Sequence, residues 1–442
     1  MAIVKPFRAH RYDLKKADSP PAALVCPPYD VIDAKMQQEL YDKTPYNVVR
    51  VEYGKQNESD TPGNDRYSRA AATLASWIRD GVLKQDSTPA FYLYEQTFDI
   101  ASGGASRSKV LVRRGIFGAV KLEPFGTGCV FPHEETFGGP KADRLNLMRA
   151  CSANLSPVFG LVPDENNDLS KLLAQGVTMK DPVFSITEDN GVVDKIWVID
   201  DQKWCAAVSE ALKKRNIYIA DGHHRYETCC NYRDERRKAD NDPQGKQDNE
   251  YNYTLMMCVP MSDKGLYILP THRLIQEAPG IAKDSFLKEA SALFDIRDCS
   301  EKEFFAVAEE ETGPVKFGVI FKDGSRKLMT VKPNATDAMN KAAGHKSEAW
   351  RALDVSVLQE LVLKGLLRLS EEKVLKKEGV SYTPDTKQAV AKVTAKDGHY
   401  AMGFVLRPTL IQQVVAMNGE KMPQKSTYFY PKLLTGLVIR KL

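Results

Sequence analysis

The spacing of apolar and polar residues along the chain predicts a mixture of helices and strands. Apolar side chains recur at helical spacing over 67–79 and 354–367, as expected where one face of a helix is buried. Runs rich in β-branched and aromatic residues over 47–53, 91–98 and 109–120 predict strands, and the last two are expected to form a hairpin. The expected fold class is therefore α/β, in the broad sense that includes α+β.

The composition changes near Ala278-Pro279-Gly280, where proline and glycine interrupt the regular patterns. Clusters of this kind mark loops and linkers. We therefore expect two units, one over 1–278 and a smaller α/β unit over 279–442. Within the first unit, the runs 254–260 and 266–269 predict a second hairpin around an Asp-Lys-Gly turn.

Composition narrows the class of protein without fixing its activity. The 442 residues are 43% hydrophobic and 27% charged, which is typical of globular chains with two or three domains. The net charge of +4 is too small to indicate a nucleic-acid-binding surface. We therefore expect no nucleic-acid partner, and an anionic small molecule is compatible with the charge. The oligomeric state is left open.

The expected location follows from features that the sequence lacks. No apolar run approaches the roughly 18 residues that span a bilayer, and the first residues show no basic flank followed by a long apolar core. The eight cysteines contain no CxxC pair, which favours reduced thiols. We expect a cytoplasmic protein without membrane contact.

The densest polar motif follows a strand-like run. An apolar, β-branched stretch leads directly into Asp221-Gly222-His223-His224-Arg225, where a helical pattern begins. A strand, a glycine turn and a helix N-terminus direct backbone N–H groups at one point, and the helix dipole also favours anions there. An arginine can add a bidentate contact to phosphate. We predict that Gly222, His223, His224 and Arg225 bind phosphate or nucleotide.

Asp221 needs a separate explanation, because a carboxylate next to a phosphate is repelled unless it holds a cation or takes up a proton. We predict that Asp221 is catalytic and binds Mg²⁺; the simpler alternative is that it only caps the helix. Zinc is disfavoured, since adjacent histidines on a helix point in different directions and no Cys or His lies at zinc spacing. The glycine patterns of a P-loop or a Rossmann dinucleotide site are also lacking.

Two polar clusters in the first half of the chain are candidate parts of the same site. Tyr29 and Asp30 follow two prolines, which hold the backbone extended. We predict substrate binding by Tyr29 and catalysis by Asp30, with a helix cap as the alternative role for Asp30. The run His133-Glu134-Glu135-Thr136 combines general-base and metal-ligand side chains. We predict catalytic roles for His133 and Glu134.

Basic and hydroxyl residues complete the candidate site. Lys141 and Arg144 begin the helix after the His-Glu-Glu-Thr run and are predicted to bind phosphate or nucleotide; a solvated loop and a capped helix are the alternative. Lys425, Ser426 and Thr427 belong to a polar and aromatic run near residue 430. We predict that they bind substrate, because ammonium and hydroxyl groups donate to anions. An exposed loop is the simpler alternative.

These motifs, together with Pro6-Phe7-Arg8 and the run 425–432, resemble nearly end to end the bacterial and archaeal family catalogued as domain of unknown function 1015. The Asp-Gly-His-His-Arg element is also similar to the second conserved motif of the ParB/sulfiredoxin superfamily, where this turn binds nucleotide phosphates. The resemblance implies a ParB/sulfiredoxin-like first unit, with Gly222 and Arg225 at the phosphate-binding positions. His223 stands where sulfiredoxin has its reactive cysteine, so sulfinic reductase chemistry is not implied.

Within that superfamily, the motif is closest to that of the free-serine kinases, which phosphorylate L-serine to O-phospho-L-serine. The resemblance therefore implies an ATP-dependent phosphotransferase for a small hydroxyl compound, with free L-serine as the leading candidate, ATP as co-substrate and Mg²⁺ as cofactor. A non-catalytic nucleotide-binding regulator of the ParB type would use the same turn and is the alternative. A phosphate-ester hydrolase is a third, weaker option.

Overall fold

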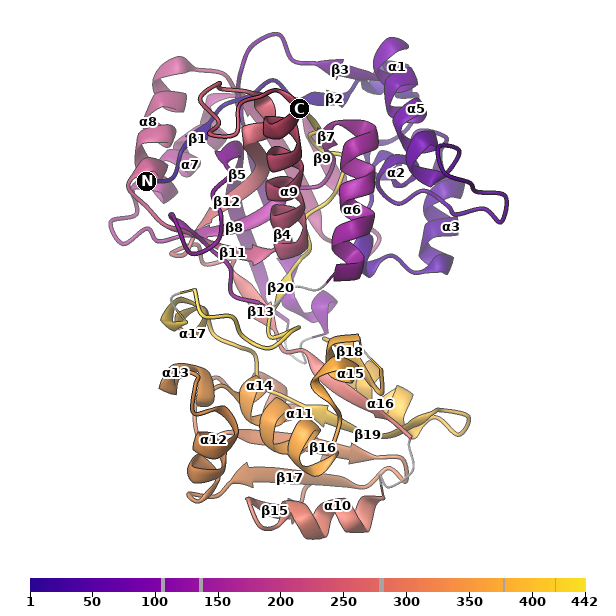
Figure 1. The fold of residues 1–442 in the computed structure, drawn as a ribbon, viewed down its shortest axis with the longest axis vertical. Helices are drawn as coiled ribbons and strands as arrows, with labels where there is room; N and C mark the ends of the chain where they lie inside the picture. The colour runs from indigo at the N-terminus through magenta and orange to yellow at the C-terminus, as the bar shows by residue number, and fades with distance from the viewer. Residues whose placement is uncertain (105–107, 135–137, 278–281, 377, 418) are drawn as a thin grey trace.

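The structure is a computed structural model that describes residues 1–104, 108–134, 138–277, 282–376, 378–417 and 419–442. Two large sheets lie toward opposite ends of the long axis, each covered by helices (Figure 1). The predicted α/β class is confirmed. Within the described ranges, every helix is too short or too polar to cross a membrane.

The first sheet has nine strands in the order β6-β11-β8-β12-β5-β4-β10-β9, and β1 pairs with β5. Its central strands are buried on both faces, as β12 shows: Leu255 and Met257 belong to one core cluster, and Met256 and Cys258 to another. A strand between two apolar layers reads as a continuous apolar run. The strands are β1 (Val4–Lys5), β4 (Phe91–Asp99), β5 (Val110–Lys121), β6 (Val130–Phe131), β8 (Val158–Val162), β9 (Phe184–Thr187), β10 (Val193–Ile199), β11 (Ile217–Asp221) and β12 (Tyr253–Pro260).

Helices pack on both faces of this sheet. Leu74 and Trp77 of α5 join the first core cluster, whereas Trp204 of α8 and Tyr226 of α9 join the second. The helices and small strands of this unit are α1 (Leu14–Ala17), α2 (Pro21–Leu24), α3 (Ala34–Lys43), α4 (Val49–Glu52), α5 (Arg66–Arg79), α6 (Gly138–Cys151), α7 (Asp168–Met179), α8 (Gln202–Lys213), α9 (His223–Ala239), β2 (His10–Tyr12) and β3 (Leu83–Gln85).

The strand expected over 47–53 is wrong, because this stretch contains the short helix α4. The Asn47 side chain accepts from the Val49 N–H and donates to the carbonyls of Ala23 and Val25. Such local side-chain bonds to the backbone compete with strand pairing. The apolar residues of this stretch are therefore buried on a helical turn.

The second sheet has six strands in the order β15-β17-β16-β19-β14-β18. The expected boundary between 278 and 279 falls on residues outside the described ranges and stays a proposal; strand pairing places β14 with the second sheet. The elements are β14 (His272–Gln276), β15 (Phe294–Asp298), β16 (Lys316–Phe321), β17 (Arg326–Val331), β18 (Val380–Thr383), β19 (Tyr400–Val405), α10 (Lys283–Ala290), α11 (Glu301–Ala306), α12 (Ala335–Ala343), α13 (Glu348–Arg351), α14 (Asp354–Val357) continued by a π-helix (Leu358–Leu366), α15 (Glu371–Lys376), α16 (Thr386–Thr394) and α17 (Ile411–Ala416).

The predicted pairing of 254–260 with 266–269 is also wrong. The first run is β12, which pairs with β5 and β8 inside the first sheet. The second contains β13 (Tyr267–Leu269), which instead pairs with β20 (Tyr428–Tyr430) between the two sheets (Figure 1). The Asp-Lys-Gly turn therefore does not close a hairpin.

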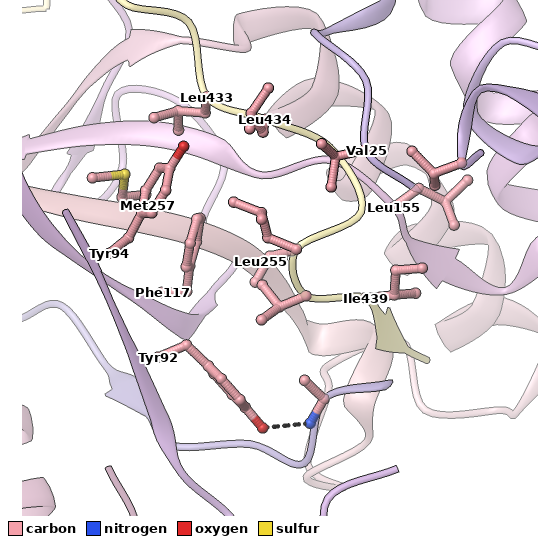
Figure 2. Packing of buried hydrophobic residues seen from close by; sticks show 14 of the residues in the cluster. Val25, Tyr92, Tyr94, Phe117, Leu155, Leu255, Met257, Leu433, Leu434 and Ile439 are labelled. Atoms are coloured by element: carbon pink, nitrogen blue, oxygen red, sulfur yellow. Dashed lines mark hydrogen bonds between the residues drawn. The ribbon is translucent and has the colours of Figure 1, made fainter. Parts of the chain in front are cut away.

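A segment near the C-terminus, residues 421–434, returns from the second sheet to the first; we call it the strap. The Met422 N–H donates to the His133 carbonyl (2.7 Å) where the strap meets the first unit. Beyond Lys432, Leu433, Leu434 and Ile439 are buried in the core of the first sheet (Figure 2). The chain then pairs through β21 (Arg440–Lys441) with β7 (Ala153–Asn154).

Candidate functional site

The structure brings the four polar clusters of the sequence together where the strap meets the first sheet. Lys425 Nζ lies 3.7 Å from a carboxylate oxygen of Asp30. The His133 N–H donates to Nε2 of His223 (3.1 Å), and the Thr427 N–H donates to the Glu134 carboxylate (3.1 Å). Residues 135 and 136 of the His-Glu-Glu-Thr run lie outside the described ranges.

The turn at the centre of the site has the predicted strand–glycine–helix form. Strand β11 ends at Asp221, and α9 begins at His223. Gly222 has a φ of 90°, in the left-handed region that favours glycine. A Cβ at this position would also lie 2.9 Å from Nε of Arg225. Gly222 therefore gives both the required backbone conformation and room for the guanidinium.

Asp221 does not act as the helix cap. The N-cap position of α9 is Gly222, and within the described ranges no side chain caps this helix. The Asp221 carboxylate instead accepts from Lys432 (2.9 Å) and, through its other oxygen, from Arg225 (2.6 Å). Burial opposes ionisation, but these two cations outweigh it and hold the pKa of the Asp221 carboxyl well below its usual range. Asp221 is a permanent anion that organises two cations.

The donor set at Asp221 does not fit the predicted magnesium site. Each carboxylate oxygen is already bonded to a cationic side chain, whereas a magnesium ligand needs an oxygen that faces the ion. Across the part of the chain that the structure describes, no three or more His, Cys, Asp or Glu side chains form a group that could hold a metal. We therefore assign no metal-dependent step to Asp221.

The two histidines of the turn contribute no charge near pH 7. Burial lowers the pKa of His223 to about 3 and that of His224 to about 4. Both imidazoles are therefore neutral near pH 7. Nε2 of His223 accepts from the His133 backbone, so the proton of the neutral ring is on Nδ1. The positive charge of the site comes from lysine and arginine.

His133 and Glu134 form a buried network with Thr427 of the strap. Nδ1 of His133 donates to the Ile219 carbonyl, and its Nε2 lies 2.9 Å from the Thr427 hydroxyl. The hydrogen of that hydroxyl is donated to the Glu134 carboxylate (3.2 Å). Burial opposes ionisation of Glu134, but contacts with His133 lower its pKa to about 2. Because His133 is 1% exposed, this network holds the strap against β11 rather than offering a base to solvent.

Removing the Thr427 hydroxyl tests this network. Thr427→Val is expected to lower the free energy of unfolding by about 1–3 kcal/mol, because it removes the buried hydroxyl that bonds Nε2 of His133 and the Glu134 carboxylate. Thr427→Ser keeps the hydroxyl and is the matched control. Urea unfolding measures both; equal stability of the valine and serine variants would show that the hydroxyl contributes nothing.

Two predicted phosphate ligands are engaged with carboxylates. Arg144 is buried, bonded to Glu52 (3.2 Å) and Asp143 (2.6 Å), and lies under the Tyr29 ring at 4.1 Å. Lys141 lies 2.9 Å from Glu227. A buried arginine bonded in this way fixes local structure, so Arg144 supports Tyr29. Direct contact of either cation with phosphate stays a prediction.

The side chains of Arg225 and Ser426 also form hydrogen bonds with other residues of the protein. The guanidinium of Arg225 donates to Asp221 and to the Pro157 carbonyl. The Ser426 hydroxyl is buried and donates to the Pro423 carbonyl (2.5 Å). Their predicted ligand contacts remain untested, and their observed role is to shape the turn and the strap.

Asp30 and Lys425 are the accessible members of the site. Asp30 lies in a single 3₁₀ turn (Tyr29–Val31), and its carboxylate is 32% exposed. The cap of α3 is Asp33, whose side chain accepts from the Met36 N–H (2.8 Å), so Asp30 has no capping role. The Lys425 side chain is 37% exposed. A carboxylate and an ammonium thus face solvent beside the turn.

Sequence reasoning missed Lys432, although it lies in the 425–432 run. Its side chain is 13% exposed, bonded to Asp221 and 4.3 Å from the Tyr428 ring. Burial opposes its protonation, but Asp221 and its neighbours keep the pKa of the Lys432 ammonium above its usual value. The available signal was the second lysine of this polar run, which also contains aromatic residues.

Comparisons with known proteins show the family. A search of the curated proteins found no match. Several solved structures are similar to this chain over most of their length, but with low TM-scores. A conserved hypothetical protein from Pyrococcus furiosus has a TM-score of 0.33 and 12% identity, covering 69% of this chain and 89% of that chain. A free serine kinase in complex with AMP has a TM-score of 0.32 and 10% identity, covering 70% of this chain and 92% of that chain. SbnI with a C-terminal truncation from Staphylococcus aureus has a TM-score of 0.34 and 9% identity, covering 73% of this chain and 86% of that chain.

The family profile described as "protein of unknown function (DUF1015)" matches residues 4–356. This span includes the Asp30 turn, His133, Glu134 and the Asp221 turn. It ends before the strap that completes the site. The chain belongs to the DUF1015 family.

Proposed function

We propose that the protein is an ATP-dependent phosphotransferase that acts on a small hydroxyl compound, with free L-serine as the first acceptor to test. The observation that supports this most is the meeting of Lys425 and Lys432 with the uncapped N-terminus of α9 at Asp221. Phosphoryl transfer depends chiefly on positioning and on positive charge around the phosphoryl oxygens. The sequence resemblance to free-serine kinases points to the same chemistry.

The phosphate would lie at the N-terminus of α9. There, backbone N–H groups and the helix dipole attract anions, and the neutral imidazoles of His223 and His224 can donate hydrogen bonds without repelling the lysines. Lys425 and Lys432 supply the charge. Asp221 holds Lys432 in place and remains an anion behind it.

The acceptor hydroxyl would lie near Asp30. Its carboxylate is partly exposed and only 3.7 Å from Lys425, so it can take the proton of a hydroxyl that attacks a phosphoryl group bound by that lysine. Tyr29, next to Asp30 and supported by Arg144, would form one wall for the acceptor. Glu134 is bonded within the protein and is assigned a positioning role.

A nucleotide-binding regulator without turnover is the second candidate. The observation that favours it is that both Asp221 oxygens are bonded to cations, so the acid of the motif offers neither a free base nor a metal site. A regulator would bind nucleotide at the same turn. The two functions differ in whether nucleotide is consumed.

The deciding experiment combines purified protein with ATP, Mg²⁺ and L-serine, with phosphorus NMR to detect phosphoserine and ADP. Asp30→Asn is expected to lower kcat about 100-fold or more while ATP affinity changes little, because a general base contributes to the chemical step. Asp33→Asn, three residues along on the capping residue of α3, is the matched control. ATP binding without turnover of serine, other amino acids or polyols would favour the regulator, and no ATP binding would reject both functions.

A further inference from the structure

Three consecutive carbonyls of the strap accept hydrogen bonds from two buried side chains of the first sheet. Arg113 of β5 donates to the carbonyls of Tyr430 (3.1 Å) and Pro431 (2.6 Å). Gln96 of β4 donates to the carbonyl of Lys432 (3.2 Å) and accepts from Arg113. These bonds fix the backbone immediately before and at the lysine that is bonded to Asp221.

The two side chains are themselves held by strand register. Gln96 is opposite Arg113 on β5 and opposite Asp194 on β10, so the three residues form a row across three strands. The Asp194 carboxylate accepts from the Gln96 amide (2.9 Å) and from Tyr94. The Gln96 nitrogen therefore faces both Asp194 and the strap, and its oxygen faces Arg113.

Burying the charged side chain of Arg113 at this position costs free energy. Arg113 is 0% exposed, and among the described residues no carboxylate forms an ion pair with it. Burial lowers its pKa to about 10, so the guanidinium is still charged near pH 7. Burying a charge without a direct counter-ion is unfavourable. The buried guanidinium of Arg113 is stabilised instead by the strap carbonyls and by the Phe159 ring, whose centroid lies 5.0 Å away.

We propose that Arg113 and Gln96 are positioning residues that set Lys432 against Asp221. They act through the strap backbone and have no role in contacting ligand. The inference rests on the proposed phosphate site for its functional meaning, whereas the placement of Lys432 can be measured without any ligand.

The test measures the reactivity of the Lys432 amine. Competitive acetylation followed by mass spectrometry reports how accessible each lysine is in the folded protein. Gln96→Met keeps the shape of the side chain and both bonds from Arg113 to the strap carbonyls. It removes the donor to the Lys432 carbonyl and to Asp194, and the acceptor of one Arg113 bond. Arg113→Lys keeps the charge, but it replaces the two nitrogens that bond the strap carbonyls by a single nitrogen at the end of an unbranched chain. We expect the acetylation rate of Lys432 to rise about tenfold in each variant, as for the loss of about one buried hydrogen bond.

Arg114→Met is the matched control. Arg114 is the next residue of β5, its side chain is 37% exposed, and it bonds Glu95 (2.6 Å) instead of the strap. This variant should leave the reactivity of Lys432 unchanged. Circular dichroism and thermal unfolding establish that each variant is folded. A folded Gln96→Met protein with wild-type Lys432 reactivity overturns the proposal, and so does an equal rise in the Arg114 variant.

Calorimetry with ATP separates this inference from the proposed function. If the wild type binds ATP, the Gln96 and Arg113 variants should bind about tenfold more weakly, and the Arg114 variant should match the wild type. If the wild type binds no ATP, the phosphate site is rejected, while the acetylation rates still decide whether the two residues position Lys432. If the variants keep wild-type ATP affinity while Lys432 is acetylated faster, the position of Lys432 does not contribute to nucleotide binding.

Discussion

Replacing Lys432 by methionine is expected to weaken ATP binding by about 3 kcal/mol, or roughly a hundredfold, as for truncating one partner of a buried charge pair. The variant removes the buried ammonium that lies 2.9 Å from Asp221. Asp221 keeps Arg225, but the net charge beside the phosphate becomes more negative. Calorimetric titration with ATP measures the loss.

A matched lysine of the strap provides the control. Lys421 lies in the same strap, and its ammonium is 5.8 Å from the Phe125 ring, so Lys421→Met should bind ATP as the wild type does. Pairing Lys432→Met with Asp221→Asn should recover part of the lost affinity, because the unbalanced carboxylate is then neutral. A Lys432 variant that is folded and binds ATP normally would remove this lysine from the site.

On acidification from pH 7 to pH 5, each of two buried histidines is expected to contribute about 2 kcal/mol of destabilisation, whereas Glu188, whose pKa burial raises to about 8, contributes in the opposite direction. Burial lowers the pKa of both His223 and His272 to about 3. The unfolded chain takes up these protons near pH 6.5, whereas the folded protein takes them up only near pH 3. The unfolded state therefore binds more protons between these values, and stability falls as pH decreases through that window.

Urea unfolding at pH 7 and pH 5 measures this change, and single variants assign it. His272 donates from Nε2 to Thr386 (2.8 Å) and accepts the Leu406 N–H at Nδ1 (3.3 Å). His272→Gln should lower stability at pH 7 and reduce the loss on going to pH 5. Glu134 and Asp221 remain ionised across this range and should not contribute. A loss between pH 7 and pH 5 that is as large in His272→Gln as in the wild type would contradict a neutral, buried His272 imidazole.

Local features of the fold were predictable from the sequence. The helix over 67–79 is observed as α5, where the Asp65 side chain caps the first turn. The hairpin of 91–98 and 109–120 is observed as β4 and β5, and the strand–turn–helix at Asp221 is observed as β11 and α9. In each case the pattern and the residues that stabilise the element lie within one short stretch.

Contacts between distant segments were not predictable. The partner of β13 is β20, about 160 residues later, so a nearby turn gave the wrong pairing. Lys432 meets Asp221 across 211 residues, and no local pattern marks such a contact. The neutral state of His223 depends on burial and on the neighbouring His133, and it also follows only from the tertiary structure.

The return of the strap has a consequence for synthesis on the ribosome. The first sheet is translated early, but part of its core, including Leu433 and Ile439, is supplied by residues made after the whole second sheet. Domains generally fold in the order in which they emerge, so the nascent first sheet has to wait with an unfilled apolar groove. A ribosome that pauses within the second unit therefore holds a first sheet that lacks Lys432 and exposes apolar surface, a state that favours aggregation.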